Sequence, residues 1–178
     1  MQISSNTSLA RPLATERFRS QARPEDLDAV VALTRSTGVF SESEVAIARE
    51  LVEENLQQGA AESGYYLLFA DGEAEDGTPR IDGYACFGPI PGTENRFELY
   101  WIAVHPEAKR SGVGKLLARA TEDAVRAEGG THIFCATSTK AEYWPARAFY
   151  EAQGYAQMAD IPDYHADGDG MAIYGKKL

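Results

Sequence analysis

The stretch Leu99-Tyr-Trp-Ile-Ala-Val-His-Pro-Glu-Ala-Lys-Arg-Ser-Gly-Val-Gly-Lys-Leu-Leu117 decides the fold. An apolar, β-branched run ends at Val104, and a turn that contains Pro106 follows it. A basic loop with two glycines, residues 109–115, then leads directly into an amphipathic helix. A strand, a glycine loop and a helix in this order present backbone N–H groups and a positive dipole end to an anion, most often a phosphate. The stretch therefore predicts a phosphate-binding loop.

The glycine loop differs from the two best-known phosphate loops. A P-loop requires Ser or Thr after its Gly-Lys pair, and here Leu116 follows Gly114 and Lys115. The dinucleotide fingerprint requires a third glycine where this chain has Leu117. An ordinary glycine-rich turn stays open as an alternative, but the basic residues and the helix after the loop favour a phosphate.

Two motifs resemble the signatures of the GNAT acetyltransferases. Val104-x-Pro-x-x-Lys-x-x-Gly-x-Gly114 resembles the acyl-CoA pyrophosphate loop of that family. Ala146-Arg-Ala-Phe-Tyr-Glu-Ala-Gln-Gly-Tyr155 resembles its second signature helix, and a strand-like run, 131–137, lies between the two. The resemblance implies an acetyl-CoA-dependent N-acetyltransferase. Such an enzyme would move an acetyl group to a primary amine of a small molecule or peptide by direct transfer in a ternary complex.

Composition narrows the class of protein. The 178 residues are 44% apolar and 25% charged, which is typical of one globular domain. Lys plus Arg is 17 and Asp plus Glu is 27, so the net charge is −10. This balance argues against nucleic acid as a partner and suits a cationic amine. No apolar run reaches the length of a membrane span and no signal pattern opens the chain, so we expect a cytoplasmic protein that does not act at a membrane.

The pattern of elements predicts an α+β fold. Residues 1–16 are expected to form a flexible arm, and residues 17–178 a single GNAT acetyltransferase domain. The expected order is β-α-α-β-β-β-α-β-α-β-β, which gives a GNAT-like mixed, mostly antiparallel sheet with helices on both faces. Residues 18–23 are the expected first strand, and Pro24 is expected to start the first helix. Ser41-Glu-Ser-Glu44 reads as a capping box for the second helix.

The resemblance also implies where acetyl-CoA, the co-substrate, would lie. It places the cofactor between the strands 96–104 and 131–137, with its pantetheine along the main chain of Ile102 and Val104. Plain core packing is the alternative for these two residues. The pyrophosphate would rest on the N–H groups of residues 110–115. The cofactor-binding residues predicted in this way form one part of the chain: Ile102, Ala103, Val104, Lys109, Arg110, Ser111, Gly112, Val113, Gly114 and Lys115. Lys109 stands where the family usually has Gln or Arg.

Two side chains are the predicted catalytic residues. Tyr150 occupies the motif position where many GNAT enzymes place a tyrosine beside the CoA sulfur, and it is the expected general acid. Glu98 is a carboxylate in an apolar strand. In a number of GNAT enzymes a glutamate on this strand deprotonates the amine, directly or through water, so the resemblance implies that Glu98 is the base, and burial near the acyl site would raise its pKa. A packed helix tyrosine and an outward-facing strand residue are the respective alternatives. The oxyanion donor is expected to be a backbone N–H at Ile102 or Ala103.

Other polar residues are interpreted as structural. Tyr143 stands where many family members have asparagine. It is expected to be a core aromatic residue, and a contact with cofactor or substrate is the alternative. The acids and histidine of 163–170 lack the later glutamate of an EF-hand, so this segment is expected to be a hairpin turn and no metal is predicted. His105 and His132 are expected to be structural. Cys86 and Cys135 are expected to be reduced core thiols.

Two other functions stay open at this point. The chain could be a non-catalytic acyl-CoA-binding or regulatory module with the same fold, or a transferase for a longer acyl group. No motif identifies the acceptor amine. A monomer and a homodimer are both compatible with the sequence.

Overall fold

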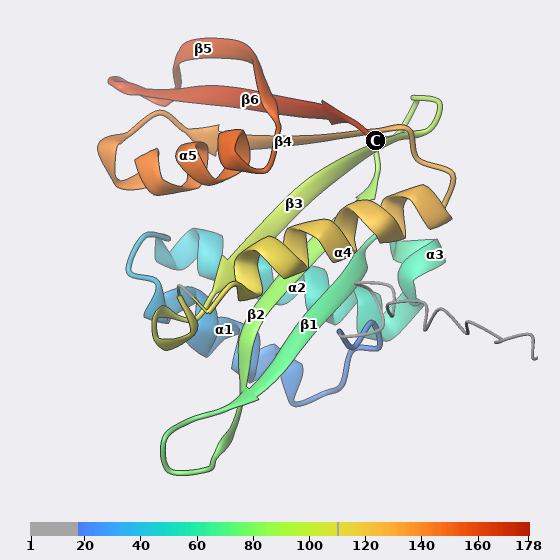
Figure 1. The fold of residues 1–178 in the computed structure, drawn as a ribbon, viewed down its shortest axis with the longest axis vertical. Coiled ribbons are helices and arrows are strands. Elements are labelled where there is room, and N and C mark those ends of the chain that lie inside the picture. The colour runs from blue at the N-terminus through green and yellow to red at the C-terminus, as the bar shows by residue number, and fades with distance from the viewer. Residues whose placement is uncertain (1–17, 110) are drawn as a thin grey trace, which may run out of the picture.

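The computed structural model describes residues 18–109 and 111–178. In this part of the chain one six-stranded sheet has the order β1-β2-β3-β4-β6-β5 (Figure 1). Its strands are β1 (Tyr66–Glu73), β2 (Pro79–Pro89), β3 (Arg96–Val104), β4 (His132–Ser138), β5 (Ala156–Ala166) and β6 (Asp169–Lys177). Neighbouring strands run antiparallel except β3 and β4, which are parallel. The predicted α+β fold with a mostly antiparallel sheet is confirmed.

Helices cover both faces of the sheet, as predicted (Figure 1). One face carries α1 (Asp26–Ser36), α2 (Glu42–Gln58) and the single turn α3 (Ala60–Ser63). The other face carries α4 (Val113–Ala127) and α5 (Trp144–Ala152). Two short 3-10 turns, η2 (Pro106–Ala108) and η3 (Ala141–Tyr143), precede α4 and α5. None of the helices in the described ranges is long and apolar enough to cross a membrane.

The core consists of two apolar clusters, one on each face. The cluster under α4 and α5 takes side chains from β1, β2, β3, β4 and β6. The cluster under α1 and α2 takes its strand residues from β1, β2 and β3 alone. The half of the sheet formed by β4, β6 and β5 is therefore covered by a helix on one face only. The candidate site lies at the boundary between this half and the half formed by β1, β2 and β3.

The N-terminal elements differ from the prediction. Residues 18–23 do not form a strand, since Arg19 makes a single antiparallel bridge to Phe69. The Arg19 side chain binds Asp26 and Asp71 instead, which directs the chain toward α1. That helix begins at Asp26 rather than at Pro24. The predicted flexible arm, residues 1–16, lies outside the described residues.

Other local predictions are confirmed. Ser41 and Glu44 form both hydrogen bonds of the capping box at the start of α2. The C-terminal hairpin is present, but β5 and β6 extend further than expected, to Ala166 and from Asp169. An ion pair connects this hairpin to α4. Lys176 of β6 donates to both carboxylate oxygens of Glu122 on α4, at 2.8 and 2.9 Å.

Candidate active site

The central feature of the candidate site is the separation of β3 from β4. The two strands pair over only three residues each, from Arg96 opposite His132 to Glu98 opposite Phe134. Beyond Glu98 the edge of β3 that faces β4 has no strand partner among the described residues. Unpaired main-chain groups on such an edge are available to an extended ligand. The gap coincides with the predicted place of pantetheine.

A bulge in β3 follows directly after the last paired residue. Cys86 of β2 pairs with Trp101 whereas Phe87 pairs with Leu99, so Tyr100 is the extra residue. A bulge bends its strand and redirects side chains. As a result Leu99 and Ile102, three residues apart, both contact the cluster under α4 and α5.

The glycine loop lies at the other end of the unpaired part of β3. Gly112 precedes α4 in the left-handed region, with φ 88° and ψ 0°. No protein atom lies within 4 Å of a Cβ built on this residue, so the space in front of the loop is open. Leu116 N–H donates to Gly112 O at 3.0 Å and forms the first turn of the helix. Ser111 N–H donates to Ala108 O at 3.3 Å and Val113 N–H to Ser111 Oγ at 3.4 Å, whereas the first amides of a helix have no partner within the helix. The geometry fits the predicted anion site.

The two sequence motifs meet at Gly114. A Cβ at this position would lie 3.3 Å from Val104 Cγ2, at the end of β3, and 3.6 Å from the ring of Phe149 on α5. The loop, the unpaired strand edge and the second motif therefore adjoin one another in space although they lie far apart in the sequence.

The remaining predicted cofactor residues surround this junction. Lys109, Ser111 and Lys115 are exposed, and Val113 is half-buried. Ser111 Oγ donates to Ala108 O at 2.7 Å, which fixes the loop. Ala103 is buried under α1 and α2. Arg110 lies outside the described residues.

Glu98 is half-buried on the sheet face that carries α1 and α2. Its cross-strand neighbour on β2 is Gly88 and its neighbour on β4 is Phe134. Burial raises the pKa of the Glu98 carboxyl above its usual value. Glu98 belongs to the last residue pair before the two central strands separate.

Tyr150 lies on the opposite face, in the cluster under α4 and α5. Its side chain is 7% exposed, and its ring packs against Tyr155 and Tyr174 at 5.7 and 5.8 Å. Burial, with the neighbouring Cys135 thiol, raises the pKa of Tyr150 well above its ordinary value. The hydroxyl is therefore protonated at neutral pH, as a general acid requires. Cys135 follows Phe134, the register partner of Glu98, so the two predicted catalytic residues flank the separation from opposite faces.

Tyr143 connects the two sides of the gap. Its hydroxyl donates toward Glu44 Oε1 at 3.2 Å, and its ring packs edge-on against Phe40 at 6.3 Å. Phe40 in turn lies 4.9 Å from the ring of Trp101. The side chain is half-buried between η3 and the start of α2 rather than in the core, which the sequence did not reveal.

His105, the two cysteines and Asp163, all interpreted as structural, take part in local packing or hydrogen bonds. His105 caps η2, since its Nδ1 accepts from Glu107 N–H at 3.3 Å. Cys86 and Cys135 are buried free thiols. Asp163 Oδ1 accepts from Gly168 N–H within the turn of the C-terminal hairpin. Within the described ranges no group of three or more His, Cys, Asp or Glu side chains is placed to hold a metal ion.

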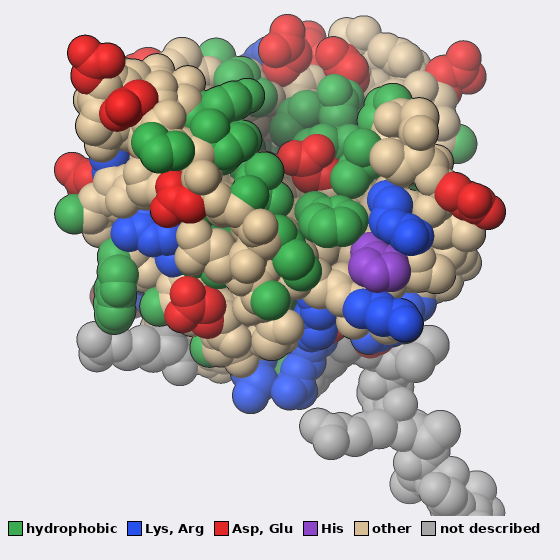
Figure 2. All heavy atoms as spheres, turned by 90° about the horizontal axis from the view of Figure 1, so that it is seen from above, with side chains coloured by type: hydrophobic (Ala, Val, Ile, Leu, Met, Phe, Trp, Pro, Cys, Tyr) green, Lys and Arg blue, Asp and Glu red, His purple; other side chains and the backbone are tan. Residues whose placement is uncertain are grey.

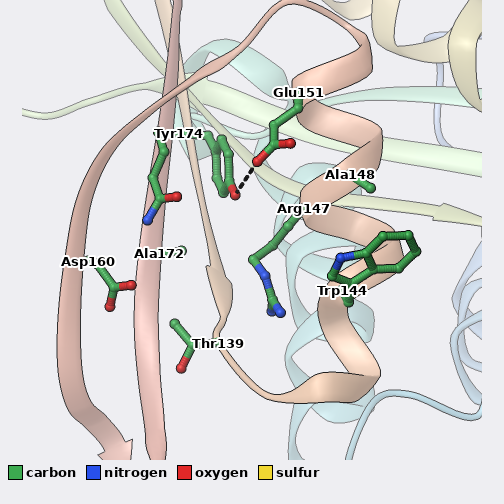
Figure 3. Close-up of a pocket in the computed structure, with 9 residues that line it drawn as sticks. Thr139, Trp144, Arg147, Ala148, Glu151, Asp160, Ala172 and Tyr174 are labelled. Atoms are coloured by element: carbon green, nitrogen blue, oxygen red, sulfur yellow. Dashed lines mark hydrogen bonds between the residues drawn. The ribbon is translucent and has the colours of Figure 1, made fainter.

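A separate hollow of about 290 Å³ lies between α5 and β5 (Figure 3). Arg147 points toward it from α5, and Glu151 accepts from Tyr174 Oη at 3.2 Å. Arg147 also donates to Ser138 O at 2.7 Å and to Lys140 O at 2.9 Å, so it supports the start of α5. None of the predicted site residues lines this hollow.

Comparison with known proteins identifies the family. Residues 31–155 match the acetyltransferase (GNAT) family model, and this range contains both motifs. The chain belongs to the GNAT family of acetyltransferases. A putative GNAT acetyltransferase from Desulfovibrio desulfuricans is 40% identical over 90% of this chain and 97% of that chain, with a TM-score of 0.83.

More distant GNAT structures share the fold. An aminoglycoside 6'-N-acetyltransferase complexed with coenzyme A is 18% identical over 90% of this chain and 96% of that chain, with a TM-score of 0.67. The PaiA N-acetyltransferase from Thermoplasma acidophilum, in complex with coenzyme A, is 21% identical over 90% and 98%, with a TM-score of 0.65. No protein of curated function matches the chain.

Proposed function

We propose that this GNAT protein is a cytoplasmic, acetyl-CoA-dependent N-acetyltransferase that moves the acetyl group directly to a primary amine. The observation that carries the proposal is the junction at Gly114. It brings the anion-binding loop, the unpaired edge of β3 and the second motif together. One extended molecule with a pyrophosphate and an amide-bearing arm matches this succession of groups.

The loop would hold the pyrophosphate of acetyl-CoA. Amides at the start of α4, with the exposed Lys109 and Lys115 nearby, supply donors and positive charge. The main chain of Ile102 and Val104 would pair with pantetheine along the strand edge that β4 leaves free. This arrangement directs the thioester toward the end of the gap, at Glu98 and Phe134.

Aminolysis of the thioester requires a neutral amine, a donor for the developing oxyanion and a proton for the leaving thiolate. Glu98 would accept the amine proton, directly or through water, because its raised pKa makes it a stronger base than an exposed carboxylate. A backbone N–H of Ile102 or Ala103 would stabilise the oxyanion. Tyr150, protonated and on the opposite face, would donate its proton to the CoA sulfur.

Calorimetric titration with CoA and a thiol-release assay with acetyl-CoA test this function. We expect CoA to bind and a panel of primary amines to include acceptors that release thiol. Binding of CoA without transfer to any amine would contradict the enzyme and favour the non-catalytic module. Faster transfer from a longer acyl-CoA would contradict the assignment of acetyl as the donor group.

A further inference from the structure

Beside Glu98, the sheet face that α1 and α2 leave uncovered carries basic, acidic and apolar side chains in register. Arg96, His132 and Lys177 are cross-strand partners on β3, β4 and β6 and form one row. The next row on this face contains Glu98, Phe134 and Gly175. Because successive rows on one face are two residues apart, they lie roughly 6.6 Å from each other. A basic row therefore adjoins the proposed catalytic carboxylate.

The basic row is close enough for its members to interact. Burial lowers the pKa of His132, and the charges of Arg96 and Lys177 lower it further. Within the described residues no carboxylate forms an ion pair with Arg96, His132 or Lys177. Arg96 Nη1 already donates to Glu94 O and to Thr131 Oγ1, and His132 Nδ1 lies 3.0 Å from Thr131 Oγ1. In a chain of net charge −10, the positive charge available to an anion is therefore that of the other guanidinium N–H groups of Arg96 and of the exposed Lys177 ammonium.

Apolar side chains occupy the rest of the face. Ala136 pairs with Ile173, and Ile173 pairs with Ala159, in the row after Phe134. Met158 and Ile161 of β5 are 58% and 39% exposed. The ring of His132 stacks on Phe134 at 6.3 Å, so the basic and apolar parts are continuous. Figure 2 shows apolar side chains gathered around a hollow on one face of the molecule.

We infer that the acceptor is an α-amino acid with an apolar side chain, bound through its carboxylate by Arg96, His132 and Lys177. The inference rests on the proposed function, and it names the substrate class of that same site. The amine would face Glu98, and the side chain would lie over Phe134 and Ile173. An α-amino acid carries its amine and carboxylate on one carbon, so with a hydrogen bond of about 2.8 Å at each end it reaches from one row to the next.

Charge and shape argue against other acceptors on this face. A polycationic amine would place further positive charge against Arg96 and Lys177, and like charges repel. A hydroxyl-rich acceptor would lose hydration against Phe134 and Ile173 without hydrogen-bond partners there. Three separate contacts on one face also distinguish the two enantiomers of an amino acid.

Titration of the CoA complex with L-phenylalanine tests the inference independently of transfer. Phenethylamine, which lacks only the carboxylate, is the matched ligand, and D-phenylalanine is the stereochemical control. We expect L-phenylalanine to bind at least about tenfold more tightly than either, since hydrogen bonds to charged groups change affinity by roughly tenfold to a hundredfold. Equal affinity for L-phenylalanine and phenethylamine would overturn the inference.

The variant Lys177→Glu reverses one exposed charge of the row. It should weaken L-phenylalanine by about tenfold or more and leave phenethylamine unchanged or tighter. In the transfer assay the same variant should raise KM for L-phenylalanine with kcat unchanged. An equal effect on both ligands would contradict carboxylate recognition. If the expected binding is seen but thiol is never released, the proposed function fails and the inferred ligand class stands.

Discussion

Strands β1, β2 and β3 carry helices on both faces, whereas β4, β6 and β5 carry α5 on one face only (Figure 1). The difference is visible along single strands. Between Ile81 and Gly88 of β2 nearly every residue is buried, and in β5 nearly every residue is exposed. A strand buried on both faces serves packing, and an uncovered face beside a ligand gap is available for binding.

The two halves share the apolar cluster under α4 and α5, but their strands pair over a short length only. Three residue pairs join β3 to β4 before the strands separate, and the Glu122–Lys176 ion pair joins α4 to β6. The short pairing leaves the rest of the β3 edge that faces β4 free for a ligand. The variants below test whether the gap, the loop and the ion pair have these roles.

Glu98→Gln should give the largest change. Removal of a general base slows transfer by about 100- to 10,000-fold. In the parent, kcat/KM should fall as pH decreases through the raised pKa of Glu98, and this acid limb should vanish in the variant. Affinity for CoA should be unchanged. Glu94→Gln, on the exposed loop before β3, is the control; an equal loss there would contradict the assignment.

Gly112→Val should weaken CoA binding by about 100-fold, since it disturbs several charge-assisted hydrogen bonds and places a side chain in the open space before the loop. Gly77→Val is a matched control, because Gly77 also has a positive φ, 81°, and open space, but lies in the β1–β2 turn. Both changes should cost about 1–2 kcal/mol of stability. Equal CoA affinity of the two variants in calorimetry would refute the loop assignment.

Lys176→Met removes the ion pair between β6 and α4 and leaves the buried Glu122 carboxylate with Arg126, 3.9 Å away, as its remaining ion-pair partner. Loss of one member of a buried pair costs about 3 kcal/mol, measured as a lower urea midpoint at unchanged slope. The double variant Glu122→Leu with Lys176→Met should recover part of the loss. No recovery would show that lost packing, rather than the uncompensated charge, causes the effect.

Tyr150→Phe should lower kcat about tenfold without changing the affinity for CoA, because only the proton donor is removed. In the parent enzyme, titration of Tyr150 should not change the rate between pH 6 and 9, because the pKa of Tyr150 lies well above this range. Tyr155→Phe, a buried tyrosine of the same cluster, is the control. Parental activity of Tyr150→Phe would contradict its role as the acid.

Glu98→Gln should also raise stability slightly at pH 7. Burial raises the carboxyl pKa in the folded state, so the folded protein binds the proton more tightly than the unfolded chain. The carboxylate therefore destabilises the fold at pH values above the unfolded pKa, and this penalty is absent at lower pH. Urea unfolding should show a gain at pH 7 that exceeds the gain at pH 4. The opposite order would contradict a desolvated carboxylate.

Local sequence patterns predicted several elements closely. Strand β3 has the predicted bounds, and the capping box of α2 forms as expected, because both depend on residues that are neighbours in the chain. Instead of the first predicted strand, the structure has one bridge, between Arg19 and Phe69. Within these few residues, pairing with the edge of the sheet competes with the Arg19–Asp26 ion pair, which directs the chain into α1. Sequence periodicity does not report such competition.

The candidate site was predicted in part. Glu98, Tyr150 and the loop residues came from motifs and from a charge in an apolar strand. The row of Arg96, His132 and Lys177 was missed, because its members come from three strands and adjoin only through sheet register. The only sequence signal of this row was the two-residue spacing of Arg96 from Glu98 and of His132 from Phe134. That spacing indicates neighbouring rows only when the parallel register of β3 and β4 is known.

The sequence by itself determined the family, the glycine loop and the order of elements, because these are encoded by residues close together in the chain. Tertiary structure decided where β3 and β4 separate, that the position of a Cβ on Gly114 lies beside Phe149, and which sheet face stays uncovered. Each of these depends on the register and packing of segments far apart in sequence. Burial of Glu98 and Tyr150, and with it the direction of their pKa shifts, arises only when those segments come together.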